Sequence, residues 1–252
     1  MATADLIEVN DLSAGYQDSQ VLSNVTFKVP RASTTVIMGR SGCGKSTLMK
    51  TMIGLLKPLA GEIVYRGAKL SAFSEKELRA FYRSLGVLFQ GSALLNSLSV
   101  ADNVSLPLRL HCPKMPRQML EEMVAMRLAQ VGLQGVETVF PGALSGGMRK
   151  RVGLARSLIM DPEIIFCDEP SAGLDPITAV GIDDLILSLR DQLGVTFVVV
   201  THELASIHRI SDRVVFLHQG GLLFEGERAA MTASGHSELI RFMARKGDND
   251  HS

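Results

Sequence analysis

The chain has 252 residues, 46% of them hydrophobic, which is enough to bury the core of one large domain or two small ones. Its 26 Lys and Arg residues balance 26 Asp and Glu residues, which excludes binding to nucleic acid or anionic lipid through net charge alone. The three cysteines, Cys43, Cys112 and Cys167, are odd in number and widely spaced. We therefore expect no disulfide framework and no CxxC metal site, as is typical of a reducing cytosol.

No segment is expected to enter a membrane. The amino end, Met1–Asp5, has neither a basic region nor a long apolar run, so no targeting signal is expected there. The longest apolar stretches, 159–167 and 195–200, are too short to cross about 30 Å of hydrocarbon. We expect a soluble protein, with any membrane crossing left to another chain.

Apolar runs alternate with helical patterns along the chain. Strands are expected at 6–9, 25–29, 34–38, 62–65 and 85–89, and helices at 45–56 and 75–83. From about 100 to 160 the pattern is helical, with a Met-rich segment at 115–131. Further strands are then expected at 164–167, 195–201 and 214–217, with helices at 177–193 and 204–210. This alternation predicts an α/β fold with a largely parallel sheet covered by helices, followed by a frayed polar tail at 246–252.

A glycine-rich segment follows the strand expected at 34–38. Residues 39–46 read Gly-Arg-Ser-Gly-Cys-Gly-Lys-Ser and match GxxxxGK[ST] between a strand and a helix. Its glycines allow backbone N–H groups to turn onto phosphate oxygens, and the next helix directs its positive end to the same anion. Lys45 would neutralise the β- and γ-phosphates, and Ser46 would hold Mg²⁺. The segment predicts a P-loop NTPase, with Cys43 as a small structural residue.

Polar residues also end three of the expected strands. Asp168 and Glu169 follow an apolar run, which would deliver Asp168 to the metal and let Glu169 polarise the attacking water. His202 follows the strand at 196–200 and would contact the γ-phosphate. Gln90 follows the strand at 85–89 and could reach Mg²⁺ or water. Each residue alone is also typical of an ordinary strand end. The apolar run and the P-loop upstream favour a catalytic role for Asp168 and Glu169, the place of His202 after a strand next to the acidic one favours a phosphate contact, and Gln90 depends on the surrounding pattern.

The segment Leu144-Ser-Gly-Gly-Met148 decides the class of NTPase. Ser145 is a good helix N-cap, and Gly146 and Gly147 allow a second helix N-terminus to approach a phosphate closely. If the helical part projects away from the core, one chain cannot bring both helix starts to a single γ-phosphate. Two chains arranged head-to-tail can.

These elements resemble the ABC ATPase family across nearly the whole chain and in that family's order. In sequence order, the matching elements are Tyr16, the 39–46 loop, Gln90, the 144–148 segment, Asp168-Glu169, Gly173-Leu174-Asp175 and His202. The resemblance implies a P-loop NTPase (RecA-like) core with an antiparallel β subdomain. It also implies an inserted α-helical signature subdomain at about 91–160, within a single nucleotide-binding domain over 1–252.

The resemblance also implies the mechanism of that family. ATP would lie between the 39–46 loop of one subunit and the 145–147 segment of the other, with Glu169, His202 and Lys45 as catalytic residues. Asp175 would communicate across the dimer, and Gln90 would link nucleotide state to a membrane partner. The implied nucleotide-binding residues are Tyr16 (stacked on adenine), Gly39, Arg40, Ser41, Gly42, Cys43, Gly44, Lys45, Ser46, Thr47, Gln90, Ser145, Gly146, Gly147 and Asp168. The implied Mg²⁺ ligands are Ser46, Gln90 and Asp168.

One residue departs from the commonest family signature, which ends in Gln. Met148 stands in its place and cannot donate a hydrogen bond, so some support from that position is lost. Together with the segments 88–95, 102–108 and 175–178, Met148 makes the chain similar to the ATPases of Mla/MCE-type lipid transport systems of Gram-negative bacteria and their relatives. That similarity implies phospholipid transport for outer-membrane lipid homeostasis, at the cytoplasmic face of the inner membrane.

The implied partners are a second copy of the chain, integral membrane permease subunits, an MCE-domain protein and a STAS-domain protein, with no nucleic acid. Residues 93–95 are interpreted equally well as a permease contact or as ordinary packing. An importer of amino acids or other small solutes would use the same ATPase and stays an alternative. A translation or DNA-repair ABC protein would typically need a second ATP-binding half or a long coiled coil, and a GTPase would need a segment such as NKxD; none of these is found in the sequence. A nucleotide kinase would not need the LSGG segment.

Overall fold

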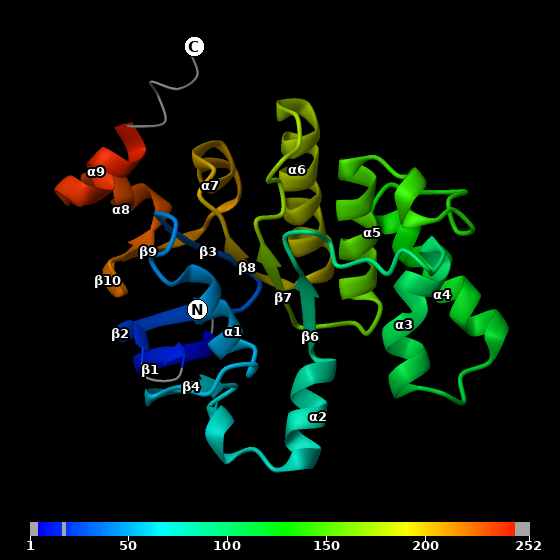
Figure 1. Cartoon of the computed structure of the whole chain (residues 1–252), viewed down its shortest axis with the longest axis horizontal. Helices are drawn as coiled ribbons and strands as arrows, with labels where there is room; N and C mark the ends of the chain where they lie inside the picture. Colours follow the sequence, from blue (N-terminus) through cyan, green and yellow to red (C-terminus); the bar gives the residue numbers. More distant parts are fainter. Residues whose placement is uncertain (1–4, 17–18, 245–252) are drawn as a thin grey trace. The chain divides into compact units, whose positions relative to one another are not determined.

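The computed structural model describes residues 5–16 and 19–244 (Figure 1). The chain forms two compact units, one comprising Met1–Tyr82 with Thr196–Ser252 and the other comprising Arg83–Val195. The frayed tail expected at 246–252 and the first four residues of the amino end lie outside the described residues.

The first unit contains an antiparallel sheet in the order β2-β1-β4-β5. Its strands are β1 (Asp5–Tyr16), β2 (Ser19–Pro30), β4 (Ala60–Tyr65) and β5 (Ala68–Lys69). Alternate residues of β2, from Val25 to Val29, are buried, as expected for a sheet with one covered face. Irregularities in the β1–β2 register near Leu12 and Ala14 bend this pair.

A second group of strands in the same unit has the order β10-β9-β3-β8. These strands are β3 (Thr34–Gly39), β8 (Thr196–Val200), β9 (Arg213–His218) and β10 (Gly221–Glu227). β3 pairs in parallel with β8 and β9, whereas β10 is an antiparallel neighbour of β9. Every residue of β3 and β8 is buried, which explains their continuous apolar runs. The helices of this unit are α1 (Lys45–Met52), α2 (Glu75–Arg83, which ends at the boundary), α7 (Leu204–Ile210), α8 (Arg228–Ala233) and α9 (Ser237–Ala244), with the 3₁₀ turn η1 (Leu70–Ala72).

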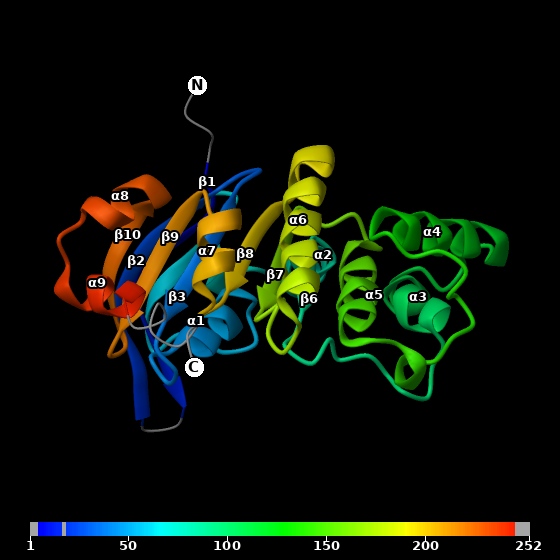
Figure 2. The same cartoon turned by 90° about the horizontal axis from the view of Figure 1, so that it is seen from above.

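The second unit contains two parallel strands and a group of helices. The strands are β6 (Leu85–Leu88) and β7 (Ile164–Asp168). The helices are α3 (Val100–His111), α4 (Arg117–Gln130), α5 (Gly146–Leu158) and α6 (Pro176–Leu193), with the 3₁₀ turn η2 (Pro141–Ala143). Helices α3, α4 and α5 pack against one another, and α5 also contacts β6, as Figures 1 and 2 show. The segment expected to be helical therefore is helical, while the subdomain limits at about 91–160 stay a prediction.

Several element bounds differ from the expected ones. The first helix ends at Met52 rather than at residue 56, because Gly54 has a φ of 76° and the N–H groups of Leu55 and Leu56 both bond to Lys50 O. The strand expected at 6–9 extends to Tyr16, since its register irregularities hide the simple alternation from the sequence. β10, α8 and α9 were not expected, because they are short and mix polar with apolar residues.

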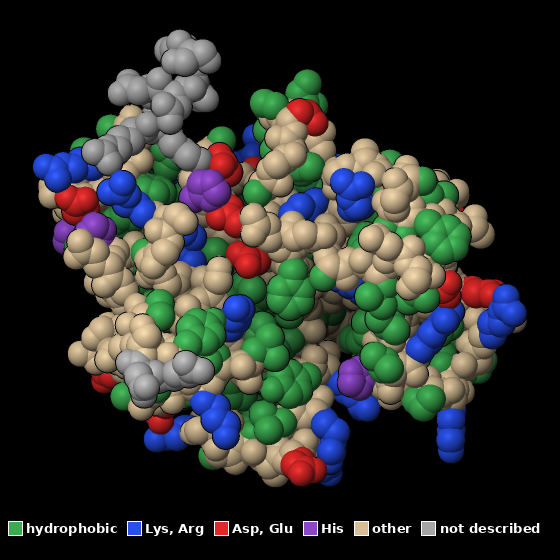
Figure 3. All heavy atoms as spheres, viewed as in Figure 1, with side chains coloured by type: hydrophobic (Ala, Val, Ile, Leu, Met, Phe, Trp, Pro, Cys, Tyr) green, Lys and Arg blue, Asp and Glu red, His purple; other side chains and the backbone are tan. Residues whose placement is uncertain are grey.

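Charges of both signs are interspersed on the face of the molecule shown in Figure 3. This matches the balanced composition of the sequence. Among residues 5–16 and 19–244, no helix is both long and apolar enough to span a membrane.

Candidate nucleotide-binding and catalytic site

The predicted phosphate loop connects β3 to α1. The strand ends at Gly39, and Gly44 is the N-cap of the helix with a φ of 105°. This positive φ is one that residues with a Cβ rarely adopt, so the backbone angle favours glycine, and a Cβ there would also displace the end of the Leu22 side chain, 2.5 Å away at Cδ2. Gly44 also has no side chain that could accept hydrogen bonds from the first N–H groups of α1. The loop therefore presents a helix N-terminus suited to an anion.

Backbone carbonyl groups of the loop hold the side chain of Lys45 over it. Its ammonium donates hydrogen bonds to Gly39 O (2.8 Å) and Arg40 O (3.1 Å). The positive charge thus lies at the loop where a phosphate would bind. Cys43 is buried in the same loop, and burial raises the pKa of its thiol. A neutral thiol of this kind suits the structural role expected for Cys43.

Tyr16 ends β1 with 45% of its surface exposed. Lys50, on the last turn of α1, lies with its ammonium 5.7 Å from the centre of the Tyr16 ring, and donates to the Tyr16 hydroxyl at 3.3 Å. A cation against the ring fixes its orientation while the ring remains partly exposed. This arrangement fits the predicted stacking on adenine.

His202 follows β8 within the same unit as the loop. β3 and β8 are parallel, with Ile37 opposite Val200. Gly39 lies two residues after Ile37, and His202 lies two residues after Val200. Thr201 N–H donates to Ile37 O at 3.2 Å and continues this pairing. The exposed His202 ring lies with Nε2 3.2 Å from a Glu203 carboxylate oxygen. The first unit therefore brings the loop and His202 to the same end of neighbouring strands.

Gln90, Asp168 and Glu169 come together at the ends of β6 and β7 in the second unit. The strands pair in parallel with Leu88 opposite Cys167, so Gln90 and Glu169 each lie two residues further on. Glu169 is 8% exposed and has a left-handed φ of 48°, whereas Gln90 is exposed. A buried carboxylate on a constrained backbone is typical of a positioned catalytic group.

The predicted signature segment begins α5. Ser145 is the N-cap, and its Oγ accepts a hydrogen bond from Met148 N–H at 3.2 Å. A Cβ on Gly147 would lie 2.4 Å from Thr178 Cγ2, so a larger residue there would force the Thr178 side chain on α6 to move. Asp175 caps α6, accepting from Thr178 N–H at 3.0 Å, and this bonding lowers the pKa of Asp175. The starts of α5 and α6 thus lie against each other.

Three side chains that the sequence analysis did not assign hold the segment after Gln90. Lys150 donates to Gln90 O and, at 3.0 Å, to Glu169 O. Arg156 donates to Ser92 O (2.6 Å) and Ala93 O (2.7 Å). Lys150 and Arg156 both project from α5. The sequence offers no signal that separates them from the other two cations of this helix, Arg149 and Arg151.

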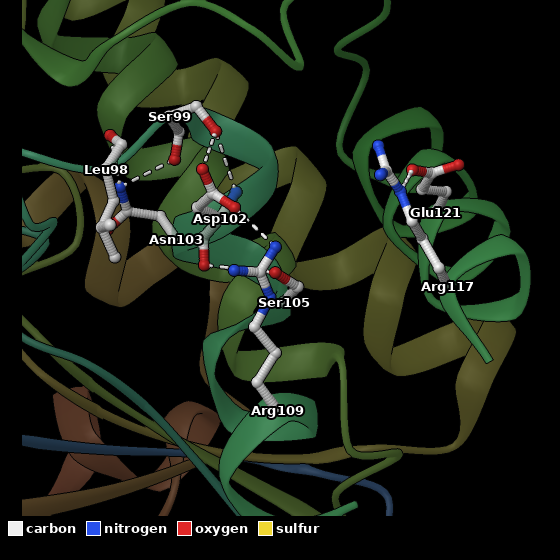
Figure 4. Close-up of polar contacts among 8 residues, drawn as sticks. All are labelled: Leu98, Ser99, Asp102, Asn103, Ser105, Arg109, Arg117 and Glu121. Atoms are coloured by element: carbon white, nitrogen blue, oxygen red, sulfur yellow. Dashed lines mark hydrogen bonds and ion pairs between the residues drawn. The ribbon is translucent and has the colours of Figure 1, made fainter. Parts of the chain in front are cut away.

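Asn103 is the third of these side chains and is fully buried on α3 (Figure 4). Its amide accepts from Leu95 N–H (2.8 Å) and donates to Leu95 O (3.0 Å), Leu98 O (3.1 Å) and Ser99 O (3.0 Å). Ser99 and Arg109 both bond to Asp102 beside it, at 2.7 and 2.6 Å. The segment 90–99 contains residues 93–95, for which a permease contact and ordinary packing were both open, and it is held by side chains from α3 and α5.

A family model and known relatives match this chain. The model described as ABC transporter matches residues 22–172. The probable ribonucleotide transport ATP-binding protein mkl of Mycobacterium bovis is 39% identical over 94% of this chain, which spans 66% of that protein's length. The intermembrane phospholipid transport system ATP-binding protein MlaF of Haemophilus influenzae is 36% identical over 98% of this chain and 92% of that protein.

A solved structure gives the same result. The ATP-binding cassette MJ0796, a dimer in a post-hydrolysis state bound to ADP and Pi, superimposes with a TM-score of 0.79 and is 29% identical. The match covers 88% of this chain and 98% of that one. These matches confirm the predicted α/β P-loop NTPase fold and the predicted nucleotide-binding ATPase of the ABC type. The chain belongs to the ABC transporter family.

Proposed function

We propose that two copies of this chain hydrolyse ATP head-to-tail and that the phosphate loop of one copy is completed by the Ser145–Gly147 segment of the other. The dimeric cassette MJ0796 supports this arrangement. So do the two helix N-termini, of α1 and α5, since each starts at a residue suited to meet a phosphate.

In this proposal each polar residue of the site has a separate role in binding or hydrolysing ATP. Residues 39–47 hold the phosphates, and the Lys45 ammonium leaves its loop carbonyls to neutralise phosphate charge. Glu169 accepts a proton from water as the water oxygen attacks the γ-phosphate and the bond to ADP breaks. His202 contacts the γ-phosphate, and Tyr16 stacks on adenine.

The side-chain oxygen atoms of the site suit a Mg²⁺ ion. We propose Ser46, Gln90 and Asp168 as its ligands, since hydroxyl, amide and carboxylate oxygens are the donors that Mg²⁺ prefers. Ser46 is exposed on the first turn of α1 and is free of any capping role. When bound, the metal would neutralise charge on the phosphates.

The transported substrate is proposed to be phospholipid. The observation that carries this is the match to an intermembrane phospholipid transport ATP-binding protein over nearly the full length of both chains. We further propose that the chain lies on the cytoplasmic face of the inner membrane beneath a permease, with MCE-domain and STAS-domain partners. The mycobacterial relative carries a ribonucleotide transport name, so that substrate is the second candidate.

The test is purification of the tagged chain from its own membranes in mild detergent, followed by reconstitution in phospholipid vesicles. We expect an integral permease to copurify and ATP-dependent phospholipid transfer to acceptor vesicles. The Glu169→Gln complex should carry the same partners without transfer. Uptake of ribonucleotides, amino acids or other small solutes, with no lipid transfer, would contradict the lipid proposal.

A further inference from the structure

Lys150 is a buried cation of the second unit. It lies on the second turn of α5, the helix that Ser145 caps, and is 5% exposed. Its ammonium donates to Gln90 O and to Glu169 O. One side chain therefore joins the signature helix to the ends of both β6 and β7.

The register of the two strands makes this contact possible. Because Leu88 pairs with Cys167 in parallel, Gln90 and Glu169 leave the sheet at the same level. The backbone of Glu169 is left-handed, with a φ of 48°. Such a conformation is unfavourable for a residue with a Cβ and persists only where neighbours hold it. The hydrogen bond from Lys150 to Glu169 O is one such restraint, and the bond from Ala172 N–H at 3.3 Å is another.

Burial disfavours the charged form of Lys150, and nearby groups partly offset this effect. Burial lowers the pKa of Lys150, while Cys167, Glu169 and Asp168 act in the opposite direction. An apolar side chain would avoid the desolvation, but both carbonyl oxygens would lose this donor. Burial of the Lys150 ammonium is therefore unfavourable in itself, and its two hydrogen bonds hold the backbone at Gln90 and Glu169.

We propose that Lys150 is a positioning residue for ATP hydrolysis: it fixes the backbone of Gln90 and Glu169 relative to each other and to the helix that begins at Ser145. The inference rests on the proposed function, because it gives Glu169 the role of polarising water. Lys150 itself touches neither nucleotide nor water in this account. Its effect is on the placement of the Glu169 carboxylate.

The experiment compares variants of the purified complex in ATPase rate, ATP affinity and melting temperature. Lys150→Met keeps the length of the side chain without its donors. We expect kcat to fall about tenfold or more, as for a misplaced catalytic group, and the Kd for ATP to stay within about twofold. ATP affinity is expected to persist because the phosphate loop and Tyr16 are unchanged.

Arg151→Met is the matched control on the same helix. Arg151 donates to Val131 O at 2.7 Å and is half-buried, so its loss removes a comparable contact away from Gln90 and Glu169. We expect this variant to lower the melting temperature while kcat is unchanged. Lys150→Arg, which retains charge and several donors, is expected to recover most of the rate.

Three outcomes overturn the inference. They are a Lys150→Met complex with the wild-type kcat, a loss of kcat matched by Arg151→Met at equal loss of stability, and a failure of Lys150→Arg to exceed Lys150→Met. If Lys150→Met does not fold, Lys150→Gln carries the test, because its shorter amide cannot reach both carbonyls, and a wild-type kcat there would also overturn it. A wild-type complex without ATPase activity would instead remove the proposed function, and the inference with it.

Discussion

Lys45 shows how single residues prepare the site for nucleotide. Its ammonium already lies over the phosphate loop, bonded to Gly39 O and Arg40 O at 2.8 and 3.1 Å. A phosphate would replace these two carbonyls with charged oxygens, which form stronger hydrogen bonds with an ammonium. The side chain needs little rearrangement to do so.

The first prediction concerns this residue. Lys45→Ala should weaken ATP binding by up to about 100-fold, since a hydrogen bond to a charged group contributes up to about 3 kcal/mol. Equilibrium binding of a fluorescent ATP analogue to the purified protein measures the change. Lys57→Met is the control, because this exposed lysine lies beyond α1 and outside the 39–47 segment. An unchanged Kd in Lys45→Ala would contradict the phosphate-loop assignment.

The role of Glu169 as the general base can be tested in the same way. Glu169→Gln keeps the shape of the buried side chain but loses the charge that accepts a proton from water. Turnover should fall by about 10²–10⁴-fold while ATP remains bound, as expected for the loss of a general base. Near-normal hydrolysis in the assembled complex would move the catalytic base elsewhere, with His202 examined first.

The contact between α5 and α6 is the clearest feature at the scale of elements. Gly147 has space for only a hydrogen atom against Thr178, which lies on the first turn of α6 just after the Asp175 cap. The glycine thus has a packing reason in addition to the phosphate contact expected from the sequence. The two reasons can be separated by mutation.

Gly147→Ala should destabilise the protein by roughly 1–3 kcal/mol, the usual cost of overpacking. Thr178→Ser removes the methyl group that would clash, so the double variant should recover most of the melting temperature. If Gly147 also approaches phosphate, ATPase activity should remain low after stability is restored. Full recovery of activity in the double variant would contradict the phosphate contact and leave Gly147 with a role in packing alone.

The sequence was a good guide to several helices. The helices Glu75–Arg83 and Leu204–Ile210 have the predicted bounds, because their apolar periodicity and flanking residues are local signals. β10 could not be predicted, since all but one of its residues are half-buried and its sequence lacks clear alternation. Lys150 and Asn103 could not be assigned either. Their partners are backbone carbonyls that only the folded chain brings within reach, and neither residue belongs to a chemical motif.

At the scale of the whole molecule, the assigned residues are divided between the two compact units. Tyr16, the phosphate loop and His202 belong to one, and Gln90, Glu169 and the signature segment belong to the other. In the proposed dimer, the signature segment of each copy would act on the nucleotide held by its partner. Closure on ATP and reopening after hydrolysis would then drive the permease.

Complementation between two inactive variants tests this shared site most directly. Lys45→Ala removes the cradle of one copy, and Ser145→Arg places a bulky side chain at the signature of the other. Differently tagged copies are coexpressed with the permease, and mixed dimers are isolated through both tags. In a mixed dimer both lesions fall on one composite site, and the other site pairs two intact halves.

The measurement is the ATPase rate of the mixed dimers against dimers of each variant alone. Each variant alone should be inactive, although Ser145→Arg should still bind ATP, and the mixed dimer should recover up to about half of the wild-type rate from its one intact site. If hydrolysis requires both sites, ATP-dependent crosslinking across the intact site should still appear in the mixed dimer. A Ser145→Arg dimer that hydrolyses ATP at the wild-type rate, or a mixed dimer with neither activity nor crosslinking, would contradict the shared site.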